Sequence, residues 1–197
     1  MKVVLSAFNN PELLSAWYRH CDGLPGVEIT DKSLLDFNID AVVSPANSFG
    51  FMDGGLDKAF AARFPGIEER VRRSIADYHD GELLVGMALC VGTDDVKIPY
   101  LISAPTMRVP MILTNSVNPY LAARAALRAA KSRSLSVAFP GMGTGVGRIP
   151  PNVCARQVKA AIQEVVMGVD RTPLSWFGAQ KTHQLLYADA TRDLQIP

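Results

Sequence analysis

The chain of 197 residues is nearly half hydrophobic (48%) and one-fifth charged, a composition typical of a packed globular protein and not of a disordered segment. Its formal net charge of +1 gives no electrostatic reason to expect long nucleic acid or an anionic membrane as a partner. The longest apolar run is too short to span a membrane, and the N-terminus lacks the apolar core of a signal peptide. We therefore expect a cytoplasmic protein.

The first half of the chain alternates between short apolar runs and helical patterns, which is typical of an α/β layer fold. Strands are predicted at residues 2–7, 26–30 and 39–44. A helix is predicted over residues 9–20, with Asn10 as its N-cap and Pro11 at its first position. Two further amphipathic helices are predicted over residues 55–64 and 67–78, where apolar residues recur at helical spacing.

The alternation continues in the second half of the chain. We predict strands at residues 83–92, 99–105 and 134–140, and helices over residues 118–133 and 151–168. Asn118 and Asn152 are the expected N-caps of these two helices, and Gly168 is the expected stop of the second. Residues 169–197 are less periodic. We expect residues 1–197 to form a single domain, with residues 169–197 as a C-terminal extension.

Cysteine and histidine give no sign of a metal site. Cys21, Cys90 and Cys154 are an odd number and include no Cys-x-x-Cys pair. The three histidines are scattered, without His-x-x-x-His spacing. We expect no disulfide framework, no metal and no cofactor.

Two long loops each leave the end of a predicted buried strand and lead into a helix, at residues 44–55 and 140–151. In α/β sheets, ligands bind outside the carboxyl ends of such strands. The second loop, "FPGMGTGVGRIPP", has glycine at every other position from Gly141 to Gly147 and matches neither G-x-G-x-x-G nor the Walker pattern. This spacing favours a cradle of backbone amides for an anion over a flexible connector.

The first loop, "SPANSFGFMDGG", ends in Gly54 and Gly55 at a helix entrance, which favours an anion site by the same argument. Two of its polar residues have ordinary alternatives. Asp57 complements the helix dipole from the first turn, and Asn47 is a common turn residue whose side chain satisfies nearby backbone groups.

Taken together, the two loops resemble a known family. "DAVVSPANSFGFMDGGLDKAF" (residues 40–60) is similar to the first signature of the macro domain family, and "VAFPGMGTGVGRIP" (residues 137–150) is similar to its second. The two segments occur in the family's order. The resemblance implies a three-layer α/β/α sandwich with a mixed central sheet. It also implies binding of ADP-ribose or an ADP-ribosylated substrate, and in some members hydrolysis of ADP-ribosyl linkages.

The resemblance assigns roles by position. Asn47 matches the residue that meets the distal ribose, and Asp57, ten residues later, completes the pair associated with hydrolysis. An Asp near that ribose can polarise a water for attack, so the candidate catalytic residues are these two. The candidate ligand-binding residues are Asp31, Ser33, Ala46, Asn47, Gly54, Gly55, Leu56, Gly143, Thr144, Gly145, Val146, Gly147 and Arg148.

The chain also departs from the family pattern. Ser44 stands where the first signature has an Asn, and Ser33 aligns with the Asp that reads adenine in the family, with Asp31 as a nearby substitute. Gly147 stands where an aromatic residue often covers the ligand, and Arg148 follows it. The sequence therefore leaves three functions open. The first is an enzyme that hydrolyses an ADP-ribosyl linkage or processes a small derivative such as ADP-ribose 1″-phosphate. The second is a non-catalytic ADP-ribose-binding module, and the third is a structural component.

Overall fold

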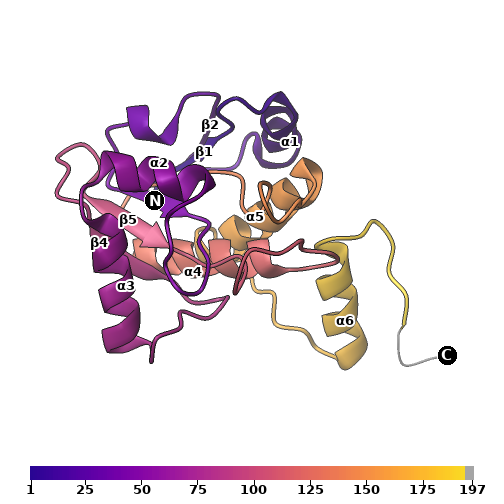
Figure 1. The fold of residues 1–197 in the computed structure, drawn as a ribbon. Helices are drawn as coiled ribbons and strands as arrows, with labels where there is room; N and C mark the ends of the chain where they lie inside the picture. Colours follow the sequence, from indigo (N-terminus) through magenta and orange to yellow (C-terminus); the bar gives the residue numbers. More distant parts are fainter. Residues whose placement is uncertain (194–197) are drawn as a thin grey trace.

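Six strands form one sheet in the order β2-β1-β6-β3-β5-β4, and helices cover both of its faces (Figure 1). All neighbouring strands run parallel except β4, which pairs antiparallel with β5. The architecture is seen in a computed structural model that describes residues 1–193, and it confirms the expected mixed central sheet. The strands are β1 (Val3–Ser6), β2 (Val27–Thr30), β3 (Ala41–Ser44), β4 (Leu89–Gly92), β5 (Tyr100–Ser103) and β6 (Val137–Phe139).

The two faces of the sheet belong to two separate hydrophobic cores. Ala41 and Val43 of β3 lie in one core, and Val42 between them lies in the other, because successive residues of a strand point to opposite faces. Three helices bury their apolar sides in the first core: α1 (Pro11–Cys21), α4 (Asn118–Ser132) and α5 (Pro151–Val165). The 3-10 helix η1 (Leu34–Asp36), α2 (Gly55–Arg63) and α3 (Ile67–Tyr78) cover the second. The expected three-layer α/β/α sandwich is confirmed.

One of the three predicted N-caps is confirmed. The Asn10 side chain accepts a hydrogen bond from the backbone N–H of Leu13 at 2.9 Å. Asn118 is instead the first residue of α4, and its Nδ2 donates to the carbonyl of Thr106. Asn152 lies inside α5 and accepts a hydrogen bond from Arg19. These two predictions were wrong because both helices begin earlier than the expected caps imply and without a side-chain cap. Helix α5 begins at Pro151, and α4 begins at Asn118, the residue before Pro119.

Other segments also differ from the expected elements. The strand predicted at residues 83–92 is regular only in β4, because Gly86 has a φ of +96° and interrupts the extended backbone. Helix α5 ends at Val165, before the expected stop at Gly168. A further helix, α6 (Trp176–Leu185), lies in the segment that showed little periodicity.

The C-terminal segment is attached to α5. Arg156 on α5 donates to the carbonyl of Ala188 at 3.0 Å and forms an ion pair with Asp189 at 2.8 Å. Figure 1 shows α6 at the margin of the body. That residues 1–197 form one domain with residues 169–197 as an extension stays a prediction. Within residues 1–193, no helix is long and apolar enough to cross a membrane.

The contrast between Asn10 and Asn152 is testable by unfolding in denaturant. Asn10→Ala removes the acceptor that caps α1 and should lower the free energy of unfolding by about 1 kcal/mol. Asn152→Ala is the matched control, because that exposed side chain lies within a helix, and it should change stability by less than about 0.5 kcal/mol. Equal losses for the two variants would contradict this account of the helix starts.

Candidate functional site

A cleft of about 400 Å³ opens at one edge of the sheet, where four parallel strands end. Three of the four contribute the residue directly after their last position, Ala7 after β1, Pro140 after β6 and Pro45 after β3, and β5 is followed three residues later by the lining residue Thr106. The pairing of β3 with β5 continues past the strands, since the N–H of Thr106 donates to the carbonyl of Ala46 at 3.0 Å. The cleft therefore has a rigid floor of extended backbone.

The structure brings most of the sequence-predicted site residues to this cleft. Asp31 and Arg148 are not among its lining residues, so Ser33 is the adenine candidate that reaches the cleft. The Ser33 hydroxyl already accepts the N–H of Leu35 at 3.2 Å, as the cap of η1. The predicted residues that line the cleft are Ser33, Ala46, Asn47, Gly54, Gly55, Leu56, Asp57, Gly143, Thr144, Gly145, Val146 and Gly147.

Sequence reasoning missed the part of the cleft that comes from the ends of β1 and β5. The rule that ligands bind beyond the carboxyl ends of parallel strands points to these segments as well, but neither carries a recognisable motif. The exposed rings of Phe8 and Phe51 are the largest of the missed side chains. The missed lining residues are Ser6, Ala7, Phe8, Asn10, Leu13, Leu34, Pro45, Phe51, Asp53, Thr106, Met107, Pro110, Pro140 and Gly141.

The glycines of the second loop serve two different purposes. The loop folds back on itself through a hydrogen bond from the N–H of Ile149 to the carbonyl of Gly143 at 3.0 Å. A Cβ on Gly147 would lie 2.6 Å from that same carbonyl oxygen, so the fold itself requires a glycine at 147. A Cβ on Gly145 would meet no described heavy atom within 4 Å. The space beside Gly145 therefore belongs to the cleft and is not needed for packing.

Asn47 closes the first loop with its side chain. Its Oδ1 accepts the N–H groups of Phe49 and Phe51 at 3.1 and 3.3 Å, and its Nδ2 donates to the carbonyl of Phe51 at 2.8 Å. The turn role that the sequence left open for Asn47 is thus present in the structure. One hydrogen of Nδ2 is left to meet a ligand, because an amide nitrogen has two.

Asp57 lies in the first turn of α2 and is hydrogen-bonded to a residue of the sheet. The hydroxyl of Ser44, at the end of β3, donates to Oδ1 of Asp57 at 2.5 Å. Burial raises the pKa of Asp57 to about 6, the Ser44 hydrogen bond opposes this rise, and the negative charge of Glu68 adds to it. Ser44, the residue that departs from the family signature, is therefore the partner of the candidate catalytic carboxylate.

The lining of the cleft offers an anion backbone donors and no side-chain cation. Its charged side chains are the carboxylates of Asp53 and Asp57, and the described lining includes neither Lys nor Arg. The first backbone N–H groups of α2 and those of the second loop lie along the same cleft. Among residues 1–193, no group of three or more His, Cys, Asp or Glu side chains is placed to hold a metal ion.

Comparison with protein families and sequences gives two findings. The model of the family described as "Macro domain" matches residues 43–158, a segment that contains both cleft-forming loops. An uncharacterised protein of Aquifex aeolicus is 34% identical over 140 residues, which are 71% of this chain and 80% of that protein.

The solved structures that resemble this one include two macrodomains. The macrodomain of Mycobacterium tuberculosis DarG aligns with a TM-score of 0.60 at 21% identity, over 68% of this chain and 87% of that one. A point mutant of the Oceanobacillus iheyensis macrodomain, solved with ADPR, aligns with a TM-score of 0.62 at 19% identity, over 71% of this chain and 77% of that one. At these identities the likeness is one of fold.

The raised pKa of Asp57 makes stability depend on pH. Asp57 is neutral in both states below about pH 4, whereas above about pH 6 the folded state carries the cost of a poorly solvated charge. The stabilisation that comes from the raised pKa is thus lost as the pH rises from about 4 to about 6. Asp57→Asn should therefore be about 1 to 3 kcal/mol more stable than the wild type at pH 7 and similar to it near pH 4.

Denaturant unfolding at both pH values measures this difference. Asp77→Asn on α3 removes an exposed carboxylate and is the control, for which we expect little change at either pH. If Asp57→Asn were less stable than the wild type at pH 7, the Ser44 hydrogen bond would outweigh the cost of burial.

Proposed function

This chain belongs to the macro domain family, and from that premise we propose that its cleft binds ADP-ribose or a close derivative and that the protein hydrolyses an ADP-ribosyl linkage. One observation carries the proposal. Two glycine-containing loops and the N-terminus of α2, distant in sequence, line a single cleft whose free space at Gly145 has no role in packing. The Oceanobacillus iheyensis macrodomain mutant, which shares the fold, was solved with ADPR.

The diphosphate belongs at the second loop. An anion in this cleft finds no lining Lys or Arg, so its hydrogen bonds come from backbone N–H groups and from neutral side chains such as Thr144. The segment from Gly143 to Gly147 and the first turn of α2 provide such groups, and the absence of a side chain at Gly145 lets the phosphates approach closely.

The two ends of the ligand then have different surroundings. Ser33 and the exposed ring of Phe8 lie at the cleft wall formed after β2 and β1, where adenine would stack and meet a hydroxyl. Asn47 and Phe51 form the wall next to Asp57, which suits the distal ribose. Asn47 acts there chiefly by shaping the loop, with one N–H left for a ribose hydroxyl.

Asp57 is the proposed general base. Its pKa of about 6 leaves it ionised at neutral pH and close enough to neutrality to accept a proton efficiently. In the proposed step, Asp57 takes a proton from a water while the water oxygen bonds to the anomeric carbon or to an ester carbonyl carbon. After attack at the anomeric carbon, the bond from that carbon to the acceptor breaks and the acceptor leaves with the electron pair. After attack at the ester carbonyl, the bond from the carbonyl carbon to the ribose oxygen breaks and ADP-ribose leaves with the electron pair. The leaving group takes a proton from solvent where it needs one.

A non-catalytic ADP-ribose-binding module is the second candidate function. Its supporting observation is that Asp57 stands in the first turn of α2, where an acidic residue stabilises the helix dipole without any chemistry. Both candidates require ADP-ribose to bind, and turnover separates them.

Binding is tested first, by calorimetry with free ADP-ribose. We expect a dissociation constant near 1 μM, which corresponds to about −8 kcal/mol. Gly145→Glu should abolish binding, because it places bulk and negative charge where the diphosphate lies. Gly92→Glu is the matched control: this exposed glycine on β4 also has no described atom within 4 Å of a Cβ, but it lies outside the cleft. If Gly145→Glu binds normally, the second loop does not hold the diphosphate.

Turnover is tested with ADP-ribose linked to Glu, Arg, Ser and a nucleic-acid end, by following released product. Asp57→Ala should lower the rate by about 10² to 10⁴-fold, the usual contribution of one acid–base group, while ADP-ribose affinity changes only a few-fold. The wild-type rate should rise with pH through about 6, as Asp57 becomes ionised. Tight binding without release from any linkage would establish the binding module instead.

A further inference from the structure

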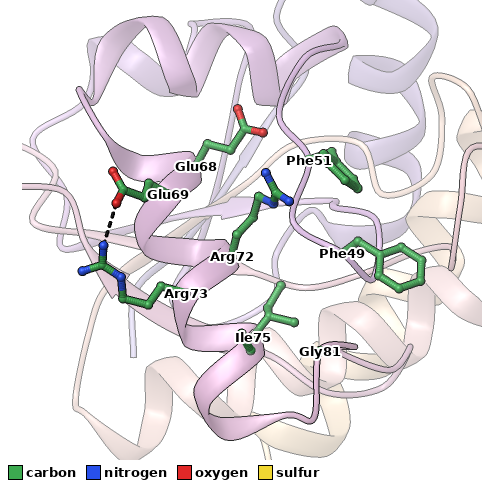
Figure 2. A pocket seen from close by; sticks show the side chains of 9 residues that line it. Phe49, Phe51, Glu68, Glu69, Arg72, Arg73, Ile75 and Gly81 are labelled. Atoms are coloured by element: carbon green, nitrogen blue, oxygen red, sulfur yellow. Dashed lines mark hydrogen bonds and ion pairs between the residues drawn. The ribbon is translucent and has the colours of Figure 1, made fainter.

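A second hollow, of about 640 Å³, adjoins the cleft on the side of α3. Phe51 lines both cavities, so the hollow begins where the proposed ribose end of the cleft stops. Figure 2 shows Phe49 and Phe51 on one side of this space and the side chains of Arg72 and Ile75 from α3 on the other.

The hollow is built by close contact between the first loop and α3. Gly50, between the two phenylalanines, has a φ of +74°, and a Cβ there would lie 2.9 Å from Cγ1 of Val71. The absence of a side chain at Gly50 thus allows the loop backbone to pack closely against the helix. Phe49 and Phe51 are thereby held beside the helix as walls of the hollow.

Two opposite charges on α3 border the hollow without being paired. Arg73 is paired with Glu69 at 2.6 Å, but Arg72 and Glu68 form no ion pair within residues 1–193. Their i,i+4 spacing would allow one. The guanidinium of Arg72 instead lies 4.4 Å from the centre of the Phe51 ring, and Figure 2 draws no ion pair between Arg72 and Glu68.

The hollow meets the cleft at Phe51, which lines both cavities and has the Arg72 guanidinium over its ring. The negative charge of Glu68 also acts on the carboxylate of Asp57. The passage beside Phe51 and Arg72 is therefore the exit that the structure offers to a group linked to the distal ribose. The chemistry of these side chains selects what that group is.

We propose that the hollow binds the polypeptide to which ADP-ribose is attached, with an acidic side chain of the peptide paired with Arg72. The inference rests on the proposed binding of ADP-ribose in the cleft. Phe49 and the exposed ring of Phe51 give the peptide's aliphatic groups an apolar surface. A nucleic-acid strand fits less well, because the two arginines of the hollow are balanced by Glu68 and Glu69 and leave no excess of positive charge for successive phosphates.

The test uses short fluorescent peptides that carry ADP-ribose through a non-hydrolysable linkage, with either Glu or Lys at the positions flanking the attachment. The wild type should bind the Glu peptide roughly two- to fivefold more tightly than the Lys peptide, the range expected for one exposed ion pair. Arg72→Glu should reverse this preference, and Arg72→Lys should keep it. Lys181→Glu, the same charge change on an exposed residue of α6, should leave it unaltered.

The affinity for free ADP-ribose is measured in parallel. It distinguishes a failure of the peptide site from a failure of the proposed ADP-ribose binding in the cleft. Free ADP-ribose should bind the wild type and Arg72→Glu equally, because Arg72 does not line the cleft. If Arg72→Glu still prefers the Glu peptide, the proposed peptide site is wrong but the proposed function stands. If the wild type does not bind free ADP-ribose, both the proposed function and the peptide site are wrong. An ADP-ribosylated oligonucleotide that binds more tightly than either peptide, and that loses this advantage in Arg72→Glu, overturns the choice of polypeptide.

Discussion

Parallel strands β1, β6, β3 and β5 end at the same edge of the sheet, and this common direction determines where the cleft lies. A parallel strand cannot return through a tight turn, so each connection needs a crossover that leaves a loop at the carboxyl edge and a helix on one face. The two signature loops are nearly a hundred residues apart in sequence, but the strands that precede them, β3 and β6, are hydrogen-bonded neighbours. Their meeting is therefore a consequence of strand order.

Much of the fold could be predicted from local pattern, and the failures have local causes. Short apolar runs that alternate with helical patterns suffice to predict a buried parallel sheet covered by helices. The strand and helix periods both reflect which side chains face the core. Caps are harder, since a helix beside a proline can begin without a side-chain acceptor, as α5 does. Helix α6 shows little apolar periodicity because most of its residues are exposed and its attachment depends on polar contacts of Arg156.

The loops of the site could also be predicted, but the contacts inside them could not. The motifs identify Asn47 and Asp57 by spacing, whereas their hydrogen bonds depend on three-dimensional neighbours. Asn47 bonds to the backbone of its own loop, and the Ser44 hydroxyl reaches Asp57 across 13 residues of sequence. Phe8 and Thr106 were missed because no motif marks the ends of β1 and β5. The hollow beside α3 likewise depends on the packing of Gly50 against Val71.

The absence of lining Lys and Arg from the cleft has a consequence for how such a site diverges. Backbone N–H donors are present whichever non-proline residue occupies a position. A substitution can therefore block a ligand's access to these donors, but it cannot make them stronger. In the proposed diphosphate site, a side chain at Gly145 would occupy free space of the cleft and could only block access to such donors. New specificities in a protein of this kind must arise at the periphery, from side chains such as Phe8, Ser33 and Arg72 that surround an unchanging centre.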